Sequence, residues 1–409
     1  MQSPTEHQRK TTDMGWPEEE ALWWYTPLSE PLLSSELARL ADARTHGDTD
    51  SVTFQPCPNP EEASQDRFVI ADWSLTGGNW AFRAVFDGHA GHETADYAAA
   101  ALPGVVRDAL VRVLDAAPAV EPDAAAVEAA LLNAIADFDA SLGEGVHALF
   151  PEAGALTDMD EAAVHAVVAA NGPAAKAAVL RAMRGSTALI ALSDPTRANL
   201  WVASLGDCAA VLGTRPEGGE WSAELLSFAH NGENPVEASR VRAAHPGEPE
   251  CMLNDRVLGV IAVTRALGDF TFKLPPVYTD RVFVPVGEAG PDMAAKLAVC
   301  SSRNHTTPYM SGVPQTIHVA PRSHGAHEAL LIMCSDGLGD LSPHRLDVSE
   351  VLAPQWVRAA ERGEPGNRAL AVLRDALGGD DLEKVSRSLT VEMTSRWMDD
   401  TTVLVQRLF

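Results

Sequence analysis

The sequence predicts an α+β fold, in which helices are kept apart from strands that pair into antiparallel sheets. Long segments such as residues 92–116 and 124–142 carry Ala, Leu and Val at helical spacing. Between residues 187 and 228, short apolar runs instead follow one another with only turn residues between them. Because these gaps leave no room for crossover helices, the strands should pair antiparallel.

The N-terminal residues 1–50 are expected to form a partly disordered extension, since the first 20 or so are mostly polar and charged. The aromatic cluster at residues 23–25 is expected to dock on the domain surface. The alternative is an aromatic peptide that binds a partner. A short helix should follow, from Ser35 to about Arg44.

Residues 51–409 are predicted to form one domain with two insertions. Its first strands, Phe68–Trp73 and Trp80–Phe86, should form a hairpin around a Gly-Gly loop. The alanine-rich and acidic stretch 143–184 is expected to be an irregular surface insertion with a helix at residues 160–170.

The second insertion is predicted at residues 274–326, where Pro275, Pro276 and Gly312 interrupt regular structure. This loop-rich segment is expected to form a lid or flap near the functional site. The remaining strands are predicted at residues 187–192, 199–205, 209–213, 221–228, 330–334 and 401–408, and the remaining helices at 235–244, 347–360, 367–377 and 382–397.

Composition excludes several classes of protein. A formal charge of −26 argues against nucleic-acid binding, which needs clustered Lys and Arg to contact phosphates. No apolar run reaches the length of a membrane span. Five cysteines without close spacing fit reduced thiols in an intracellular compartment. We therefore expect no nucleic-acid or membrane partner. The oligomeric state expected is a monomer.

The cytoplasm or nucleus is the favoured location. Residues 1–50 carry ten acidic and only four basic side chains, whereas a mitochondrial presequence is rich in Arg and poor in acid. A mitochondrial location is the alternative if a presequence has been removed.

Aspartates stand at the ends of four apolar runs that are far apart in the sequence. Asp87, Asp207 and Asp336 close three of these runs, and Asp399 and Asp400 precede the fourth. Taken singly, each Asp-Gly pair fits an ordinary turn at the end of a strand. Their repetition favours a hard-cation site, because Mg²⁺ and Mn²⁺ prefer oxygen ligands.

Seven stretches carry more specific signals. In chain order they are SQDRF, AVFDGHAG, RGSTALIAL, LWVASLGDCAAVL, VTRALGDFTFK, LLIMCSDGLGDLS and MDDTTVLV. In this order they resemble the metal-dependent serine/threonine phosphatases of the PP2C (PPM) family, over roughly residues 64–409. HNGENPVEASRVRAAHPGE and TTPYMSGVP look more like its branch of pyruvate dehydrogenase phosphatases. The resemblance implies an αββα sandwich, with two central antiparallel sheets flanked by helices.

The resemblance also implies two Mn²⁺ or Mg²⁺ ions at one edge of the sandwich. The residues that it assigns to them are Asp87, bridging both ions, the carbonyl of Gly88, Asp336 and Asp399. Asp66 would hold metal-bound water. A third, looser ion would fall on Asp207 and Asp336.

The implied reaction is hydrolysis of phosphoserine and phosphothreonine in proteins by a metal-bridging hydroxide, with Asp66 and Asp87 in the catalytic set. His89 resembles the family's candidate general acid, which protonates the departing oxygen. The alternative role for His89 is a hydrogen bond to a carboxylate. His92 is expected to be an ordinary polar residue on the next helix.

Other residues in or near the matching stretches are expected to be structural. Those with an expected structural role are Thr187, Cys208, Arg265 and Gly268. Asp269 should help to shape the loop that leads to the flap, with contact to metal-bound water as the alternative. Asp137 and Asp139 are expected to be solvated.

The chain departs from the family pattern beside the predicted site. Residues 59–66 contain no arginine where many members carry one that clamps the substrate phosphate, and Arg67 would point to the other face of an alternating strand. Gln65 replaces the usual glutamate. These departures leave two alternatives to a protein phosphatase: a pseudophosphatase that acts as a binding module, and a phosphatase of small phosphorylated metabolites. No proposed metal ligand is missing, so activity is favoured.

Overall fold

The computed structural model describes residues 9–15, 21–116, 123–342 and 347–409. The chain divides into two compact units, each with a sheet and a hydrophobic core. Unit 1 comprises Met1–Asp66, Ala209–Leu226 and Pro321–Phe409, and unit 2 comprises Arg67–Cys208 and Ser227–Ala320. The predicted α+β class, with antiparallel sheets flanked by helices, is confirmed.

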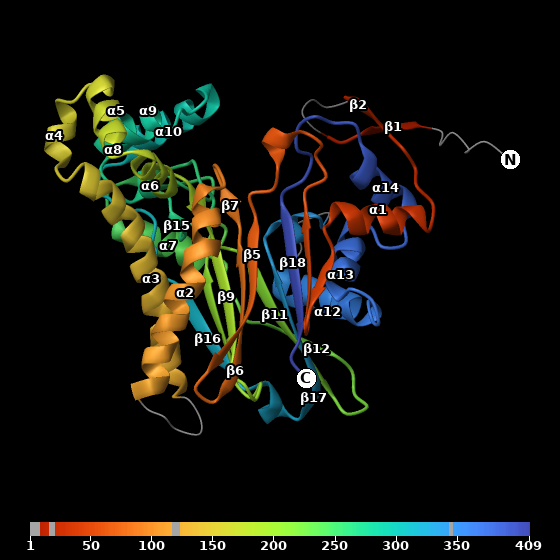
Figure 1. Ribbon diagram of the computed structural model, residues 1–409. Coiled ribbons are helices and arrows are strands. Elements are labelled where there is room, and N and C mark those ends of the chain that lie inside the picture. Colours follow the sequence, from red (N-terminus) through yellow and green to blue (C-terminus); the bar gives the residue numbers. More distant parts are fainter. Residues whose placement is uncertain (1–8, 16–20, 117–122, 343–346) are drawn as a thin grey trace. The chain divides into compact units, whose positions relative to one another are not determined.

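Unit 2 is built on a five-stranded antiparallel sheet in the order β16-β10-β9-β6-β5 (Figure 1). Its strands are β5 (Arg67–Leu75), β6 (Gly78–Phe86), β9 (Ala188–Ser193), β10 (Leu200–Leu205) and β16 (Gln315–Val319). The predicted hairpin of β5 and β6 is confirmed, with Arg67 opposite Phe86. The strands β9 and β10 are buried along their whole length, which explains their unbroken apolar sequences.

Two long helices, α2 (Glu93–Ala116) and α3 (Ala124–Leu149), lie side by side along this sheet (Figure 1). Their apolar faces and the sheet share one core, which includes Phe82, Leu102 and Ile135. The helix α3 begins where the Asp123 carboxylate accepts hydrogen bonds from the first free N–H groups. Both helices were predicted, and α3 runs seven residues beyond the predicted end at residue 142.

The first predicted insertion is more ordered than expected. Residues 143–184 complete α3 and form α4 (Ala153–Thr157), α5 (Glu161–Ala170) and α6 (Pro173–Met183). Val164, Val168 and Val179 are buried in the core of unit 2, so the expectation of a surface elaboration was wrong. Within the described ranges, no single helix is long and apolar enough to cross a membrane; α5 and α6 meet those criteria only together, across a bend of 119°.

The second predicted insertion also contains regular structure. It forms α8 (Pro276–Tyr278), the π-helical turn η4 (Thr279–Phe283), α9 (Val284–Val286), α10 (Pro291–Arg303) and the edge strand β16. The smaller elements of unit 2 are β7 (Gly88–His89), β8 (Gly185–Ser186), β15 (Leu267–Gly268), β13 (Met252–Leu253), β14 (Arg256–Val257), α7 (Pro235–Ala244), η2 (Pro249–Cys251) and η3 (Phe270–Phe272). The strands β15, β8 and β7 form a separate three-stranded sheet.

Unit 1 is built on a six-stranded antiparallel sheet in the order β12-β11-β17-β18-β4-β3. Its strands are β3 (Arg44–His46), β4 (Thr49–Phe54), β11 (Ala209–Pro216), β12 (Ser222–Leu225), β17 (Ala326–Cys334) and β18 (Thr401–Arg407). Its helices are α1 (Leu32–Leu40), α11 (Gly337–Asp340), α12 (Ala353–Arg362), α13 (Arg368–Leu377) and α14 (Leu382–Thr390), with the turns η1 (Pro60–Glu62), η5 (Pro321–His324) and η6 (Val348–Leu352). The predicted helix at 382–397 therefore ends seven residues early.

The N-terminal segment is more ordered than an extension. Strand β1 (Lys10–Asp13) pairs with β2 (Leu22–Tyr25), which corrects the expected disorder for residues 10–13. Residues 1–8 and 16–20 lie outside the described part of the chain. Trp23 and Tyr25 pack with Val391 and Met393, so the aromatic cluster docks on its own unit as predicted. The five cysteines, all in described ranges, form no disulfide.

Candidate metal centre

Two acidic residues of unit 1 meet at one end of its sheet. Strands β17 and β18 run antiparallel with Cys334 opposite Val403, so the end of β17 lies beside the start of β18. Asp336 follows β17 and Asp399 precedes β18. Between them, Gly337 approaches the chain so closely that a Cβ there would lie 2.1 Å from the carbonyl oxygen of Asp400. The Asp-Gly pair is therefore required by close packing of the two segments.

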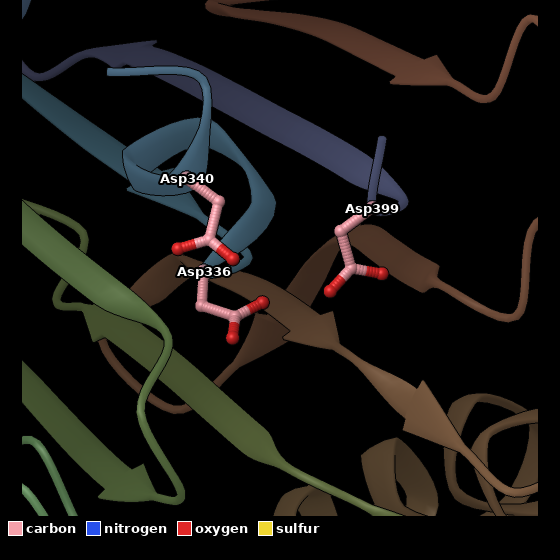
Figure 2. A group of neighbouring side chains, drawn as sticks. All are labelled: Asp336, Asp340 and Asp399. Atoms are coloured by element: carbon pink, nitrogen blue, oxygen red, sulfur yellow. The ribbon is translucent and has the colours of Figure 1, made fainter. Parts of the chain in front are cut away.

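Asp336, Asp340 and Asp399 bring three carboxylates together (Figure 2). One oxygen of each lies within 4.8 Å of the others. Burial raises the pKa of Asp399, and the nearby Asp400 and Asp340 carboxylates raise it further. Three oxygen donors with concentrated negative charge form the kind of set that Mg²⁺ or Mn²⁺ binds. The donor set therefore fits a hard divalent cation.

Sequence reasoning missed Asp340. It ends the short helix α11, and its backbone N–H donates to the carbonyl of Asp336, one helical turn earlier. Residues four apart lie on the same face of a helix, so the spacing SDGLGD was the signal that could have identified it.

Asp66 lies behind this cluster in unit 1. It is buried, and its Oδ2 accepts a 2.7 Å hydrogen bond from the hydroxyl of Ser335, the residue before Asp336. Burial raises the pKa of Asp66 to about 7, and the charge of Asp400 adds to this rise. Asp66 therefore supports the segment that carries Asp336, while its expected contact with metal-bound water stays a prediction.

Asp400 is held by protein groups on both oxygens. Its Oδ1 accepts from the Gln55 side chain at 2.9 Å, and its Oδ2 accepts from the backbone N–H of Gln65 at 2.8 Å and from Arg396 at 3.1 Å. Gln65 thus contacts Asp400 through its backbone N–H. A glutamate at position 65 would also have this N–H. Asp400 anchors the segment leading into β18, and its own N–H donates to Asp399 at 2.9 Å.

The other predicted residues belong to unit 2. Asp87 follows β6, and its backbone is fixed by Thr187: the Asp87 N–H donates to the Thr187 hydroxyl at 3.1 Å, and the Thr187 N–H donates to the Asp87 carbonyl at 2.9 Å. Gly88 and His89 form β7, paired with β8. Asp207 follows β10, and its Oδ2 accepts from the Asn231 side chain at 3.2 Å. The bridging role of Asp87, the carbonyl of Gly88 as ligand and a third ion on Asp207 and Asp336 stay predictions.

His89 contacts a carboxylate, as its alternative role requires. Its Nε2 lies 2.6 Å from Oδ2 of Asp269, which is buried. The two contacting side chains lie directly against Gly185. A Cβ at this position would lie 1.9 Å from Nε2 of His89 and 2.3 Å from Oδ2 of Asp269. This contact does not exclude proton transfer, because the imidazole has a second nitrogen.

Arg67 and His92 are both engaged by Asp96 of helix α2. Arg67 Nε donates to one Asp96 oxygen at 2.6 Å, and Nδ1 of His92 lies 2.7 Å from the other. Arg67 is therefore directed toward α2. His92 is exposed and paired on the surface, as expected of an ordinary polar residue.

Asp139 corrects one expectation. It is buried, and both its oxygens accept from the ammonium of Lys273 at 2.8 Å. Its Oδ1 also accepts from the backbone N–H of Gly268 at 2.9 Å. A solvated side chain was expected, but a lysine 134 positions away in the sequence compensates its charge. Asp137 is exposed, as expected.

Comparisons with known proteins identify the family of the chain. The family model Protein phosphatase 2C matches residues 55–352. A protein phosphatase 2C homolog of Schizosaccharomyces pombe is 30% identical over 386 residues, covering 86% of this chain and 79% of that protein. The mitochondrial pyruvate dehydrogenase (acetyl-transferring) phosphatase 1 of Homo sapiens is 29% identical, and the match spans 56% of this chain but only 48% of that protein.

A solved structure shows the same fold. The serine-threonine phosphatase 2C of Toxoplasma gondii superimposes with a TM-score of 0.51 at 16% identity, covering 89% of this chain and 96% of that one. At this identity the likeness concerns the fold alone. Proteins of the matching family depend on metal ions, generally Mn²⁺ or Mg²⁺. By the family model and the yeast relative together, the chain belongs to the protein phosphatase 2C family of protein serine/threonine phosphatases.

Proposed function

We propose that this chain hydrolyses phosphoserine and phosphothreonine in proteins with two bound Mn²⁺ or Mg²⁺ ions and, at lower affinity, a third. The observation that carries the proposal is the convergence of Asp336, Asp340 and Asp399, whose oxygens lie within 4.8 Å of one another. When bound, the ions neutralise the phosphate ester and acidify the attacking water.

The residues have distinct proposed roles. Asp87, with the carbonyl of Gly88, joins Asp336 and Asp399 in holding the pair of ions, and Asp66 orients water. Asp207 joins Asp336 at the third ion. His89 donates a proton to the serine or threonine oxygen as its bond to phosphorus breaks.

The substrate is proposed to be a basic phosphoprotein, because a chain of formal charge −26 attracts positively charged partners. The human relative named for its action on pyruvate dehydrogenase supplies one candidate, phosphorylated pyruvate dehydrogenase. We propose a monomer that acts in the cytoplasm or nucleus, with the mitochondrion as the alternative because that relative is mitochondrial by name.

The test is hydrolysis of a phosphothreonine peptide with Mn²⁺ or Mg²⁺, compared among the wild type, Asp87→Asn, Asp336→Asn, Asp399→Asn and Asp380→Asn. The first three variants should lose about 10³-fold in kcat/KM, because each removes a charged ligand. Asp380 is exposed and lies outside the cluster of Asp336, Asp340 and Asp399, so its variant should retain full activity.

Two outcomes would replace the proposal. A wild type that is inactive with every metal but binds phosphopeptides would be a pseudophosphatase that serves as a binding module. A wild type that prefers small phosphorylated metabolites over basic and acidic phosphopeptides would be a metabolite phosphatase.

A further inference from the structure

We propose that Asp269 is the positioning residue for His89, and that the buried ion pair of Asp139 and Lys273 holds the turn that presents Asp269. The inference rests on the proposed function, in which His89 is the proton donor. All four residues lie in unit 2.

The contact between Asp269 and His89 determines that Nε2 of the imidazole carries a hydrogen. A carboxylate only accepts hydrogen bonds, so the 2.6 Å contact places a hydrogen on Nε2 of His89. Proton exchange with the leaving group then passes through Nδ1. The proton donor is therefore the imidazolium, which carries hydrogen on both nitrogens. As the P–O bond breaks, its electron pair stays on the serine or threonine oxygen, which takes the Nδ1 proton and leaves a neutral ring with hydrogen on Nε2. A proton from the attacking water later restores the imidazolium. Fixing the tautomer and the ring plane is how a carboxylate serves a catalytic histidine.

Asp269 is held in an unusual backbone conformation. Its φ is 54°, in the left-handed region, and it follows Gly268 with φ of 74°. Non-glycine residues in this region store about 1 kcal/mol of strain or more, and such strain persists only where neighbours impose it. The Asp269 N–H donates to the carbonyl of Arg184 at 2.9 Å, which fixes one side of the turn.

The Asp139–Lys273 pair fixes the other side of the turn. Asp139 Oδ1 accepts the N–H of Gly268, and Lys273 also donates to the carbonyl of Ala266 at 2.7 Å. The two side chains are 8% and 7% exposed, so the pair is desolvated. A buried ion pair often stabilises a fold no more than apolar packing at the same place would. A contribution to stability therefore does not by itself explain why this pair is present. Its contacts to residues 266 and 268 give it a geometric role at the turn.

Gly185 provides a variant that separates the pair without removing either partner. An alanine there would place a methyl group 1.9 Å from Nε2 of His89 and 2.3 Å from Oδ2 of Asp269. The backbone of Gly185 is not in the left-handed region, so alanine adds no strain of its own. Gly185→Ala therefore tests the contact even if Asp269→Asn folds poorly.

The first readout compares two substrates of different leaving-group quality. In Asp269→Asn and Gly185→Ala, kcat on a phosphothreonine peptide should fall about 10²-fold at unchanged KM. On p-nitrophenyl phosphate, whose leaving group needs little protonation, the fall should stay below about tenfold. Asp139→Asn should show the same substrate pattern with a smaller loss. The matched control is Asp255→Asn, since Asp255 is an exposed aspartate with φ of 57° and should lose nothing.

The second readout is independent of activity. ¹⁵N NMR of the metal-free protein is recorded at a pH where the ring is neutral, with His89 assigned by its loss in His89→Gln. It should show hydrogen on Nε2 in the wild type and a tautomer mixture in Asp269→Asn and Gly185→Ala. A neutral ring with hydrogen on Nδ1 and none on Nε2 in the wild type, or equal losses on both substrates, would overturn the role of Asp269. An Asp139→Asn protein with wild-type spectrum and kcat would overturn the role of the ion pair. If the wild type hydrolyses neither substrate, the proposed function fails, and the spectrum still decides whether Asp269 sets the tautomer.

Discussion

The hydroxyl of Ser335 donates a 2.7 Å hydrogen bond to the carboxylate of Asp66, and both groups are buried. The same hydroxyl accepts the backbone N–H of Thr402 at 2.9 Å. One side chain thus joins Asp66 to the segments that carry Asp336 and Asp399. Removing it should affect both stability and metal binding.

We expect Ser335→Ala to lower the free energy of unfolding by about 1–3 kcal/mol, because the buried Asp66 carboxylate and the Thr402 N–H each lose a hydrogen bond. Urea denaturation of the metal-free protein measures the change. Ser51→Ala is the matched control: Ser51 is also a buried serine of unit 1, and its hydroxyl has no hydrogen-bond partner within the described residues. That variant should be neutral or slightly stabilising. Equal losses in the two variants would contradict the assignment to the Asp66 bond.

Asp340 should contribute to metal affinity. Asp340→Asn removes one of three clustered negative charges while keeping the side-chain volume, so the Kd for Mn²⁺ should rise about 10- to 100-fold. Isothermal titration calorimetry measures this directly, with Asp380→Asn as the control. Activity of Asp340→Asn should recover at high metal concentration. An unchanged Kd would exclude Asp340 from the site.

Local patterns predicted the parts of the fold that depend on neighbouring residues. The β5–β6 hairpin, α2 and α7 follow from periodicity, turn residues and a proline at the first helical turn. The helix predicted at residues 160–170 is confirmed as α5, but α4 and α6 were missed because short alanine-rich helices are weakly amphipathic. Their burial comes from packing against distant parts of the core, which no local pattern reports.

The acidic centre was predicted only in part for a similar reason. Asp336 and Asp399 stand at strand ends, where a motif can be recognised. The sequence signals Asp340 only by its spacing of four residues from Asp336, and a helix of four residues adds no longer periodic pattern to support that signal. The burial of Asp139 was not predicted, because its partner Lys273 lies 134 positions away in the sequence. Sequence patterns identify side chains at element ends, whereas long-range charge pairs require the folded structure.

His230 should make the protein less stable in mild acid. Its Nδ1 accepts the backbone N–H of Gly206 at 3.2 Å, and its Nε2 lies 2.7 Å from Oε1 of Gln315. The ring is therefore neutral with hydrogen on Nε2, and a second hydrogen on Nδ1 would face the Gly206 N–H. Burial lowers the pKa of His230 from its ordinary 6.5 to about 4.

Because the folded-state pKa is depressed, the unfolded chain binds more protons between pH 6.5 and 4. This contribution to stability is complete above pH 6.5 and decreases as the pH falls toward 4, by about 3 kcal/mol in all. Denaturation at several pH values should show that the free energy of unfolding depends less steeply on pH in His230→Asn than in the wild type. His46→Asn, at an exposed position of β3, should follow the wild type. If the free energy of unfolding depends on pH equally in the wild type and in His230→Asn, the prediction is wrong.

Lys273→Met should be among the most destabilising substitutions in unit 2. It leaves the buried Asp139 carboxylate without its cation, and removing one partner of a buried ion pair typically costs about 3–5 kcal/mol. The double variant Asp139→Asn/Lys273→Met removes the charge as well, so it should regain much of that loss. Urea denaturation of the two single variants and the double variant completes the cycle. If stability returns in the double variant while kcat on the phosphothreonine peptide stays low, the ion pair acts through the geometry of the Gly268–Asp269 turn. Recovery of both together would assign the pair to stability alone.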